Sequence, residues 1–182
     1  TNGAISAEAQ SSEDAVVIDG TQMTHSLSPM YRLLILGAGD VAKFVAEMAI
    51  ALEYDVMLCD PRPNYLDNWS VPVVETTAQL PDDVVRERFS NPYSGIIALA
   101  HDPRVDDMAL MEALKTNAFY IGAMGSVKTS AARRERLPEL GLSFDEIDRL
   151  HAPIGFQINS KTPAEIAIAV MAEITSVRYQ EK

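Results

Sequence analysis

The chain has 182 residues, and 47% of them are hydrophobic, so it is long enough to form one domain around a substantial core. Its formal net charge of −11 and its pI of about 4.6 argue against general affinity for nucleic acid or anionic membranes, because both require basic surface. The single cysteine, Cys59, excludes an intrachain disulfide and a multi-cysteine zinc site, and its apolar surroundings predict a buried thiol.

The first thirty residues differ in composition from the rest, with four acidic residues and no Lys or Arg. We predict that residues 1–30 form a flexible segment and linker, with one short strand at "AVVIDG", and that residues 31–182 form the folded domain. The start "TNGAISAEAQSSED" lacks the basic and apolar regions of a signal peptide, and no apolar stretch approaches the roughly 18 residues that cross a bilayer. We therefore expect a cytoplasmic protein with no membrane partner.

Apolar runs and helix-period stretches alternate from residue 31 onward. Strands are predicted at residues 32–36, 54–60, 71–77, 94–100 and 118–125. Helices are predicted at residues 41–52, 81–89, 104–117 and 126–140, with capping boxes at residues 143–146 and 162–165, the second of which opens a last helix. This alternation is typical of a Rossmann-like, doubly wound α/β domain with a mainly parallel sheet and helices on both faces.

A first glycine turn follows the first predicted strand. Gly37, Gly39 and Ala42 match G-x-G-x-x-G/A, in which the glycines permit a tight turn and close approach to a pyrophosphate. Asp60 follows the next strand at about the spacing of the acid that binds a ribose 2′-hydroxyl, and Arg62 lies where a 2′-phosphate would be met. The pattern predicts a dinucleotide site and favours NAD over NADP.

Asp40 follows Ala38 and Gly39 in this turn and complicates the prediction. A carboxylate at a helix N-terminus interacts favourably with the helix dipole, and it can satisfy the free N–H groups itself. The same charge repels a pyrophosphate. The turn therefore has two interpretations, a working nucleotide site or a Rossmann scaffold whose phosphate site has been lost.

His101 and Asp102 lie at the carboxyl end of a central predicted strand, where open α/β sheets bind ligands. We predict ligand contact for His101 and a helix-capping role for Asp102 before Pro103, and keep both as catalytic candidates. His151, in the turn-rich stretch "HAPIGFQINSKTP", is a third catalytic candidate or a structural histidine. No metal site is predicted, because the remaining histidine, His25, lies in the linker.

A second glycine turn lies in "YIGAMGSVKTS". Gly122 and Gly125 precede Ser126, a good N-cap, and Lys128 in the first helical turn is unfavourable to the dipole unless an anionic ligand is bound there. Three arginines follow on the same helix: Arg133, Arg134 and Arg136. They form either a positive field for an anion or a solvated face paired with neighbouring acids such as Glu135 and Glu139.

Several motifs in this order resemble a known family: "LLILGAGDVAKFVAEMAIALEYDVMLCDPRP", "HDPRVDD", "YIGAMGSVKT", "ERLPELGLS" and "HAPIGFQINSKTPAEIAIAVMAEI". Over roughly residues 31–178 the chain is similar to the C-terminal Rossmann domain of the XdhC/CoxI family, accessory factors of xanthine dehydrogenase and related molybdenum hydroxylases. The resemblance implies binding of molybdenum cofactor (molybdopterin), its protection during sulfuration, and its transfer to the apoenzyme. It also implies an apo molybdenum hydroxylase and a cysteine desulfurase as partners.

The resemblance carries over to the motif positions Gly37–Gly39, His101-Asp102, Gly122–Ser126 and His151–Gly155, without a catalytic role for any of them. The family turn usually reads G-A-G-H, whereas this chain has Asp40. Full-length members also have an N-terminal domain with a cysteine-containing glycine-rich motif, which residues 1–30 do not match. The chain is therefore expected to be a C-terminal half, a short member or a fragment.

The leading hypothesis is a non-catalytic maturation factor that binds molybdenum cofactor or NAD(P) in its crevice. The alternatives are a fragment of an NAD-dependent oxidoreductase, with His101 or His151 transferring a proton, and a structural dimerisation domain. The last predicted helix has an apolar stripe but ends in "RYQEK", so it either caps the core or packs on a partner, and we expect a homodimer.

Overall fold

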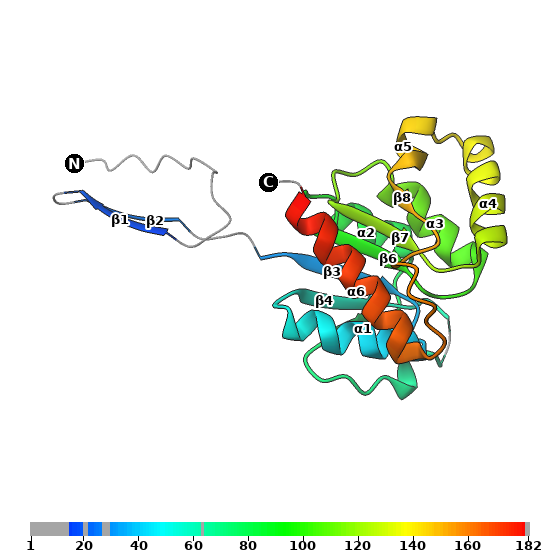
Figure 1. Cartoon of the computed structure of the whole chain (residues 1–182), viewed down its shortest axis with the longest axis horizontal. Coiled ribbons are helices and arrows are strands. Elements are labelled where there is room, and N and C mark those ends of the chain that lie inside the picture. The colour runs from blue at the N-terminus through cyan, green and yellow to red at the C-terminus, as the bar shows by residue number, and fades with distance from the viewer. Residues whose placement is uncertain (1–14, 20–21, 27–29, 63, 181–182) are drawn as a thin grey trace. The chain divides into compact units, whose positions relative to one another are not determined.

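The computed structural model describes residues 15–19, 22–26, 30–62 and 64–180, and the chain divides into two compact units, residues 1–30 and 31–182. In the first unit, β1 (Ala15–Asp19) and β2 (Gln22–Ser26) pair as an antiparallel hairpin (Figure 1). Only the first of these strands was expected, and His25 belongs to β2 rather than to a linker. The segment predicted to be flexible, residues 1–13, lies outside the described residues.

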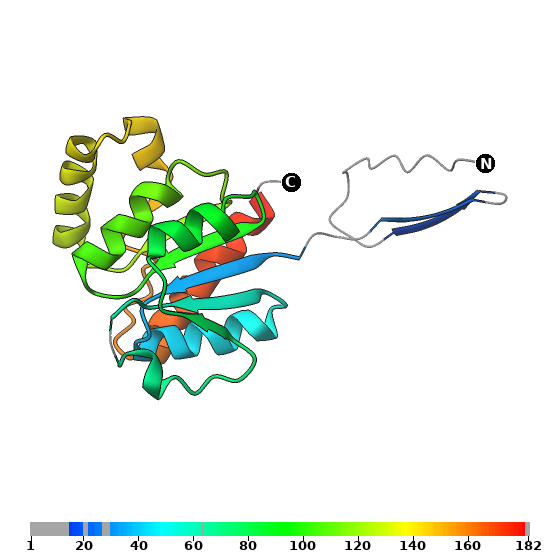
Figure 2. The same cartoon turned by 180° about the vertical axis from the view of Figure 1, so that it is seen from behind.

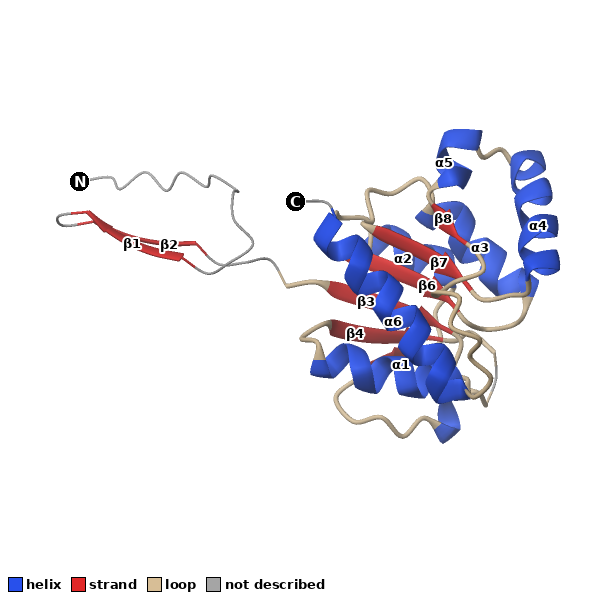
Figure 3. Ribbon diagram, in the orientation of Figure 1, coloured by secondary structure: helices blue, strands red, loops and turns tan. Residues whose placement is uncertain are grey.

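The second unit contains a six-stranded parallel sheet, which confirms the predicted fold class (Figure 3). Its strands are β3 (Arg32–Leu36), β4 (Asp55–Cys59), β5 (Glu75–Thr77), β6 (Ser94–Ala98), β7 (Tyr120–Ala123) and β8 (Leu150–His151). They lie in the order β5-β4-β3-β6-β7-β8. The order reverses between β3 and β6, which is the topological switch point where Rossmann domains bind ligands.

Helices cover both faces of this sheet. They are α1 (Asp40–Ala51), α2 (Pro81–Arg88), α3 (Pro103–Ala113), α4 (Val127–Arg136), α5 (Phe144–Asp148) and α6 (Pro163–Gln180), with 3₁₀ turns η1 (Leu66–Asn68) and η2 (Leu137–Leu140). α1 and α6 pack together on one face, and α2 and α3 pack together on the other, which Figure 2 shows from behind. Within the described residues, no helix is both long and apolar enough to cross a bilayer.

The core explains why the apolar runs form strands. Side chains of β3 alternate between the two faces, so Leu34 and Leu36 pack toward α2 and α3 while Leu33 and Ile35 pack toward α1 and α6. A strand buried on both faces is apolar at nearly every position, as the sequence "RLLIL" is. Cys59 lies in the same core, where burial raises the pKa of its thiol to about 12, as expected for an inert residue.

Helix starts follow the predicted capping. Ser143 and Glu146 form a capping box at α5, and the Thr162 hydroxyl and Glu165 carboxylate exchange hydrogen bonds with each other's backbone N–H before α6. The turns that follow β3, β4, β6, β7 and β8 are called here the carboxyl edge of the sheet. The caps of α5 and α6 fix where these helices begin relative to that edge. The predicted site residues lie along this edge.

Candidate functional site

The first glycine turn packs directly against the end of β6. Gly37 has φ of 100°, and a Cβ on it would lie 2.4 Å from Cα of Ala100, so no other residue fits without moving backbone. Gly39 is exposed and forms the N-cap of α1, where no side-chain hydrogen bond caps the helix. Asp40 is the exposed first residue of α1, so its charge faces solvent at the turn without capping the helix start.

Asp60 is fully buried beside this turn. Its Oδ2 accepts the N–H of Ala38 at 2.9 Å, and both its oxygens accept from Arg62, at 2.8 Å from Nε and 2.6 Å from Nη2. Burial opposes ionisation, but the hydrogen bonds from Arg62 and Ala38 outweigh it and hold the pKa of Asp60 below its usual range. The carboxylate predicted to bind a ribose therefore binds the protein's own turn.

Arg62 extends this arrangement across the switch point. Its Nη1 donates to the carbonyl of Ala100 at 3.0 Å, and its guanidinium lies 3.7 Å from the ring centre of Tyr65. One side chain thus joins the end of β4 to the end of β6. Because Asp60 already engages the guanidinium with two hydrogen bonds, Arg62 has little capacity left for a 2′-phosphate.

His101 follows Ala100 with φ of 56°, an uncommon backbone conformation for a residue with a side chain, and it is exposed. The preceding residue, Ala100, is held on both sides, because Asp106 Oδ1 accepts its N–H at 3.1 Å and Arg62 donates to its carbonyl. Asp102 caps α3 by accepting the N–H of Arg104 at 3.0 Å, which confirms the capping prediction. His101 is thereby presented to solvent at the carboxyl edge by a rigid turn.

Asp106 and Asp107 on α3 were missed by the sequence analysis. Asp106 is 1% exposed, and burial raises its pKa to about 6. Arg133 is also buried and donates to Asp107 at 2.9 Å from Nε, with Asp106 at 3.5 Å from Nη2. The only sequence signal was a pair of adjacent acids, "DD", inside an otherwise apolar helical pattern.

The three arginines of α4 therefore form neither a ligand-facing field nor a solvated face. Arg133 and Arg136 pair with Asp107, and Arg134 donates to the carbonyls of Ile147 and Leu150. They do not pair with Glu135 or Glu139, the neighbouring acids that the sequence suggested. The arginines dock α4 onto α3 and β8, and Lys128 is an exposed cation on the same helix.

The second glycine turn has a different construction from the first. Gly122 is buried in β7, where a Cβ would lie 2.6 Å from Cδ1 of Ile154, so close packing accounts for this glycine. Ser126 caps α4 as predicted, accepting the N–H of Thr129 at 3.1 Å. Lys128 is exposed in the first turn of α4, with no ion-pair partner among the described residues.

His151 lies in β8, not in a loop, and is held in a polar cluster. Its ring stacks on Tyr120 with centres 4.6 Å apart, and its Nδ1 lies 3.3 Å from Oε1 of Glu173 on α6. Glu173 Oε2 accepts the hydroxyl of Tyr120 and, at 2.8 Å, the N–H of Gly155. Burial alone would raise the pKa of Glu173. The hydrogen bonds lower it by a larger amount, so the pKa lies below its usual range. The cluster fastens the segment after β8 to α6.

That segment forms one wall of a cavity. The cavity has a volume of about 230 Å³ and lies between the turn Met124-Gly125 and residues 153–160, with Ile166 and Ala169 of α6 also lining it.

A larger, open apolar groove of about 810 Å³ lies on the surface of α1 and α6, around Met48 and Ile168. In the described part of the chain, no three His, Cys, Asp or Glu side chains are placed to share a metal ion.

The strand order and the glycine turn at the switch point define a Rossmann-type α/β domain. Comparison with known families refines this class, because residues 33–174 match the family described as the XdhC Rossmann domain. The chain therefore belongs to the XdhC family.

Named relatives agree with this assignment. The chain is 30% identical over 154 residues to the molybdenum cofactor insertion chaperone PaoD of Escherichia coli K12, and the match covers 85% of this chain and 42% of that protein. It is 27% identical to a probable xanthine dehydrogenase component of Bacillus subtilis 168, over 84% of this chain and 44% of that one. A crystal structure described as a xanthine dehydrogenase from Bacillus halodurans superposes with a TM-score of 0.73 at 27% identity, covering 91% of this chain and 48% of that chain. The chain thus spans less than half the length of each of these relatives.

Proposed function

We propose that this chain is the Rossmann domain of an accessory factor that binds molybdenum cofactor and assists its sulfuration and insertion into a molybdenum hydroxylase of the xanthine dehydrogenase type. Membership of the XdhC family and the 30% identity to a molybdenum cofactor insertion chaperone support the ligand class. The partners follow from the same proposal: an apo molybdenum hydroxylase, and a cysteine desulfurase as sulfur donor. No step of chemistry is assigned to the chain's own residues.

One observation carries the choice of molybdenum cofactor over a dinucleotide. Asp60, the acid that would accept a ribose hydroxyl, is fully buried and bonded to Arg62 and to the N–H of Ala38. Both oxygens of Asp60 already accept two hydrogen bonds each, so a ribose hydroxyl would have to displace one of them. Losing a hydrogen bond to a charged group costs about 1.5–3 kcal/mol. Asp40 adds an exposed negative charge at the turn where a pyrophosphate would bind.

The second turn fits an anionic cofactor better. The first-turn N–H groups of a helix have no intrahelical partners, and at α4 Ser126 caps only the N–H of Thr129. Lys128 adds an exposed positive charge there. When bound, molybdenum cofactor supplies the redox-active centre of the target hydroxylase. The chain's residues bind its anionic part and shield it from water.

The second candidate is an NAD-dependent oxidoreductase fragment, which the strand order and the turn Gly37–Gly39 favour. In that case His101 would be the proton-transfer group, because it is the exposed histidine at the switch point. His151 is less suited, because Tyr120 and Glu173 hold its ring.

The test measures thermal unfolding of the full chain with molybdenum cofactor, NAD and NADP. A ligand at 100 times its dissociation constant adds about 2.7 kcal/mol of stability, which shifts the midpoint by several degrees. We expect a shift with molybdenum cofactor alone, and transfer of that cofactor to an apo xanthine dehydrogenase with recovery of activity. Stabilisation by NAD with none by molybdenum cofactor would overturn the proposal in favour of the second candidate.

A further inference from the structure

The cavity of about 230 Å³ beside the second glycine turn has the build of a ligand site. Its walls combine apolar side chains, among them Ile154 and Phe156, with the polar residues Asn159 and Ser160. Ligand sites in proteins share this composition, an apolar lining with a few polar groups. The volume is below the roughly 300 Å³ at which sites for drug-sized ligands begin, so the cavity admits one small ring system and not a dinucleotide.

The walls are fixed by packing and hydrogen bonds. Glu173 accepts the N–H of Gly155, and a Cβ on Gly155 would lie 3.1 Å from backbone atoms of α6. Ile154 packs so closely on Gly122 that a Cβ there would lie 2.6 Å from its Cδ1, and a larger residue would require the side chains to move. Segment 153–155 is therefore clamped between β7 and α6, and the cavity is formed before any ligand arrives.

A buried hydroxyl lies next to this cavity without a partner. Ser130 is 1% exposed, and its Oγ has no hydrogen-bond partner among the described residues. A Cβ on Gly125, which lines the cavity, would lie 3.4 Å from that Oγ and 2.6 Å from Oγ1 of Thr129. A buried polar group without a partner is costly and rare in native structures. Glycine at position 125 keeps a side chain from being pressed against these two hydroxyls.

Two cationic side chains lie near the cavity, although the chain as a whole carries −11. The nearby carboxylates of Glu165 and Glu173 are already hydrogen-bonded to backbone N–H groups. Lys128 lies three residues after Gly125, and Lys161 directly follows the lining residue Ser160. Both lysines are exposed, and in the described part of the chain neither forms an ion pair. The start of α4 adds the positive end of a helix dipole at the same turn.

We propose that this cavity binds a small flat nitrogen heterocycle that carries an anionic group. The ring packs against Phe156, and the anion lies toward Ser126 and Lys128. This inference rests on the proposed function, since the pterin-phosphate part of molybdenum cofactor has this chemistry. A nucleoside monophosphate has the same chemistry and is the second source to be distinguished.

The test titrates the full chain with three probes, pterin-6-carboxylate, GMP and inorganic phosphate, and measures affinity by calorimetry. We expect the pterin to bind more tightly than GMP.

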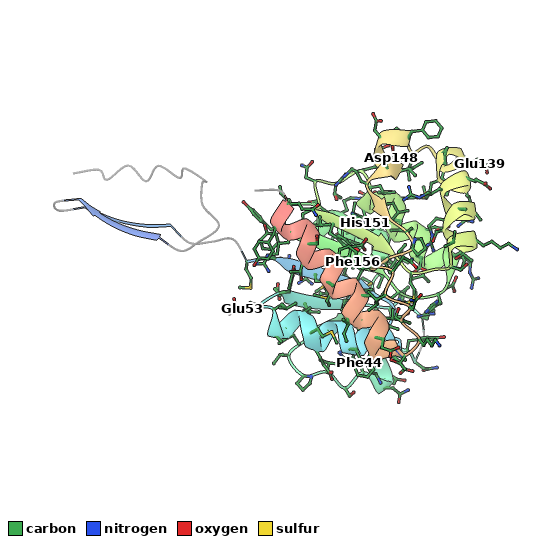
Figure 4. The ribbon with its side chains drawn as sticks, in the orientation of Figure 1. Phe44, Glu53, Glu139, Asp148, His151 and Phe156 are labelled. Atoms are coloured by element: carbon green, nitrogen blue, oxygen red, sulfur yellow. The ribbon has the colours of Figure 1, made fainter. Side chains whose placement is uncertain are left out.

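We expect Phe156→Ala to weaken pterin binding by about tenfold, because stacking on an aromatic side chain contributes about 1–3 kcal/mol. The matched control is Phe44→Ala, a similarly exposed phenylalanine on α1 and outside the cavity, which should change affinity less than about twofold. Figure 4 labels both side chains.

A second pair of variants tests the anion. Lys128→Ala should weaken binding of pterin-6-carboxylate and phosphate and reduce the salt dependence of both. Lys115→Ala, which removes an exposed lysine that follows α3 and forms no ion pair within the described residues, should not. Equal effects of the two variants would overturn the anion assignment.

The outcomes separate this inference from the proposed function. If the chain binds molybdenum cofactor but Phe156→Ala leaves that affinity unchanged, the cavity is not the site and the proposed function survives. If GMP binds more tightly than the pterin, with the same dependence on Phe156 and Lys128, the cavity is a ligand site and the proposed ligand is wrong. If none of the three probes binds, the inference is overturned.

Discussion

The two glycine turns of this domain have the same local order, strand, glycine, helix, but the structure uses them differently. At the first turn, residues 37–40, the protein's own groups fill the space: Ala100 packs on Gly37, and Asp60 binds the N–H of Ala38. At the second turn, residues 122–126, a cavity opens beside Gly125. The first turn of the adjacent helix carries Lys128, whereas the first turn of α1 carries Asp40. A motif therefore predicts a backbone shape, whereas the neighbouring side chains decide whether a ligand has room and matching charge.

The largest expected effect tests how tightly the first turn is closed. Gly37→Ala forces a side chain into a positive φ and against backbone of β6, which together should cost about 4 kcal/mol in the free energy of unfolding. Urea denaturation measures the change. Gly39→Ala is the control, because a Cβ there meets no atom within 4 Å and φ is −92°. If the two variants are equally stable, the first turn is not closed against β6.

Removing Arg62 tests the ion pair at the switch point. Arg62→Ala leaves the buried Asp60 carboxylate without its charged partner, and we expect a loss of about 3 kcal/mol by the same measurement. Arg104→Ala breaks an exposed pair with Asp102 and should lie within experimental error of the parent. A gain of NAD binding by Arg62→Ala would sharpen the comparison, because it would show that this side chain alone excludes the dinucleotide.

The buried carboxyl group of Asp106, which accepts the N–H of Ala100, predicts a pH dependence of stability. Burial raises its pKa in the folded chain from 3.8 to about 6, so the folded state holds the proton more tightly than the unfolded state. The stability contributed by this group is full below about pH 4 and is lost as pH rises through about 6. The parent should lose about 2 kcal/mol over that window relative to Asp106→Asn, which has no carboxyl group to titrate. Parallel curves of unfolding free energy against pH for the two proteins would contradict the assignment.

The smallest expected effect concerns the charge at the first turn. Asp40→Asn removes an acid from the start of α1 and should lower stability by about 0.5 kcal/mol or less, because the carboxylate interacts favourably with the helix dipole. The variant should not gain affinity for NAD in a calorimetric titration, because Asp60 and Arg62 remain paired. Tight NAD binding after this single change would mean that Asp40, and not the ion pair, closes the turn.

The sequence was most informative where the signal is local. The run "RLLIL", the glycine turn and the residues Ser126, Ser143 and Thr162 each define a strand, turn or cap within a few positions, and all are confirmed. The two-residue strand β8 is too short to show a periodic pattern, so His151 was placed in a loop.

The sequence was least informative about partners that are distant along the chain. Arg133 pairs with an acid 26 positions away, and no pattern links them. Arg62 is only two positions from Asp60, yet composition does not reveal that the carboxylate points inward to the N–H of Ala38. The cavity was not predicted, because it arises from the packing of residues 153–160 on α6 and the second turn.

The clamp made by Glu173 has a consequence for biosynthesis. Two walls of the cavity, Ile166 and Ala169, and the carboxylate that holds Gly155 all belong to α6, which leaves the ribosome after every other lining segment. A nascent chain without docked α6 has the strand, the glycines and the lysine of the second turn, but it lacks the α6 wall of the cavity. Ligand binding at the proposed site would therefore require a chain whose last helix has folded and docked.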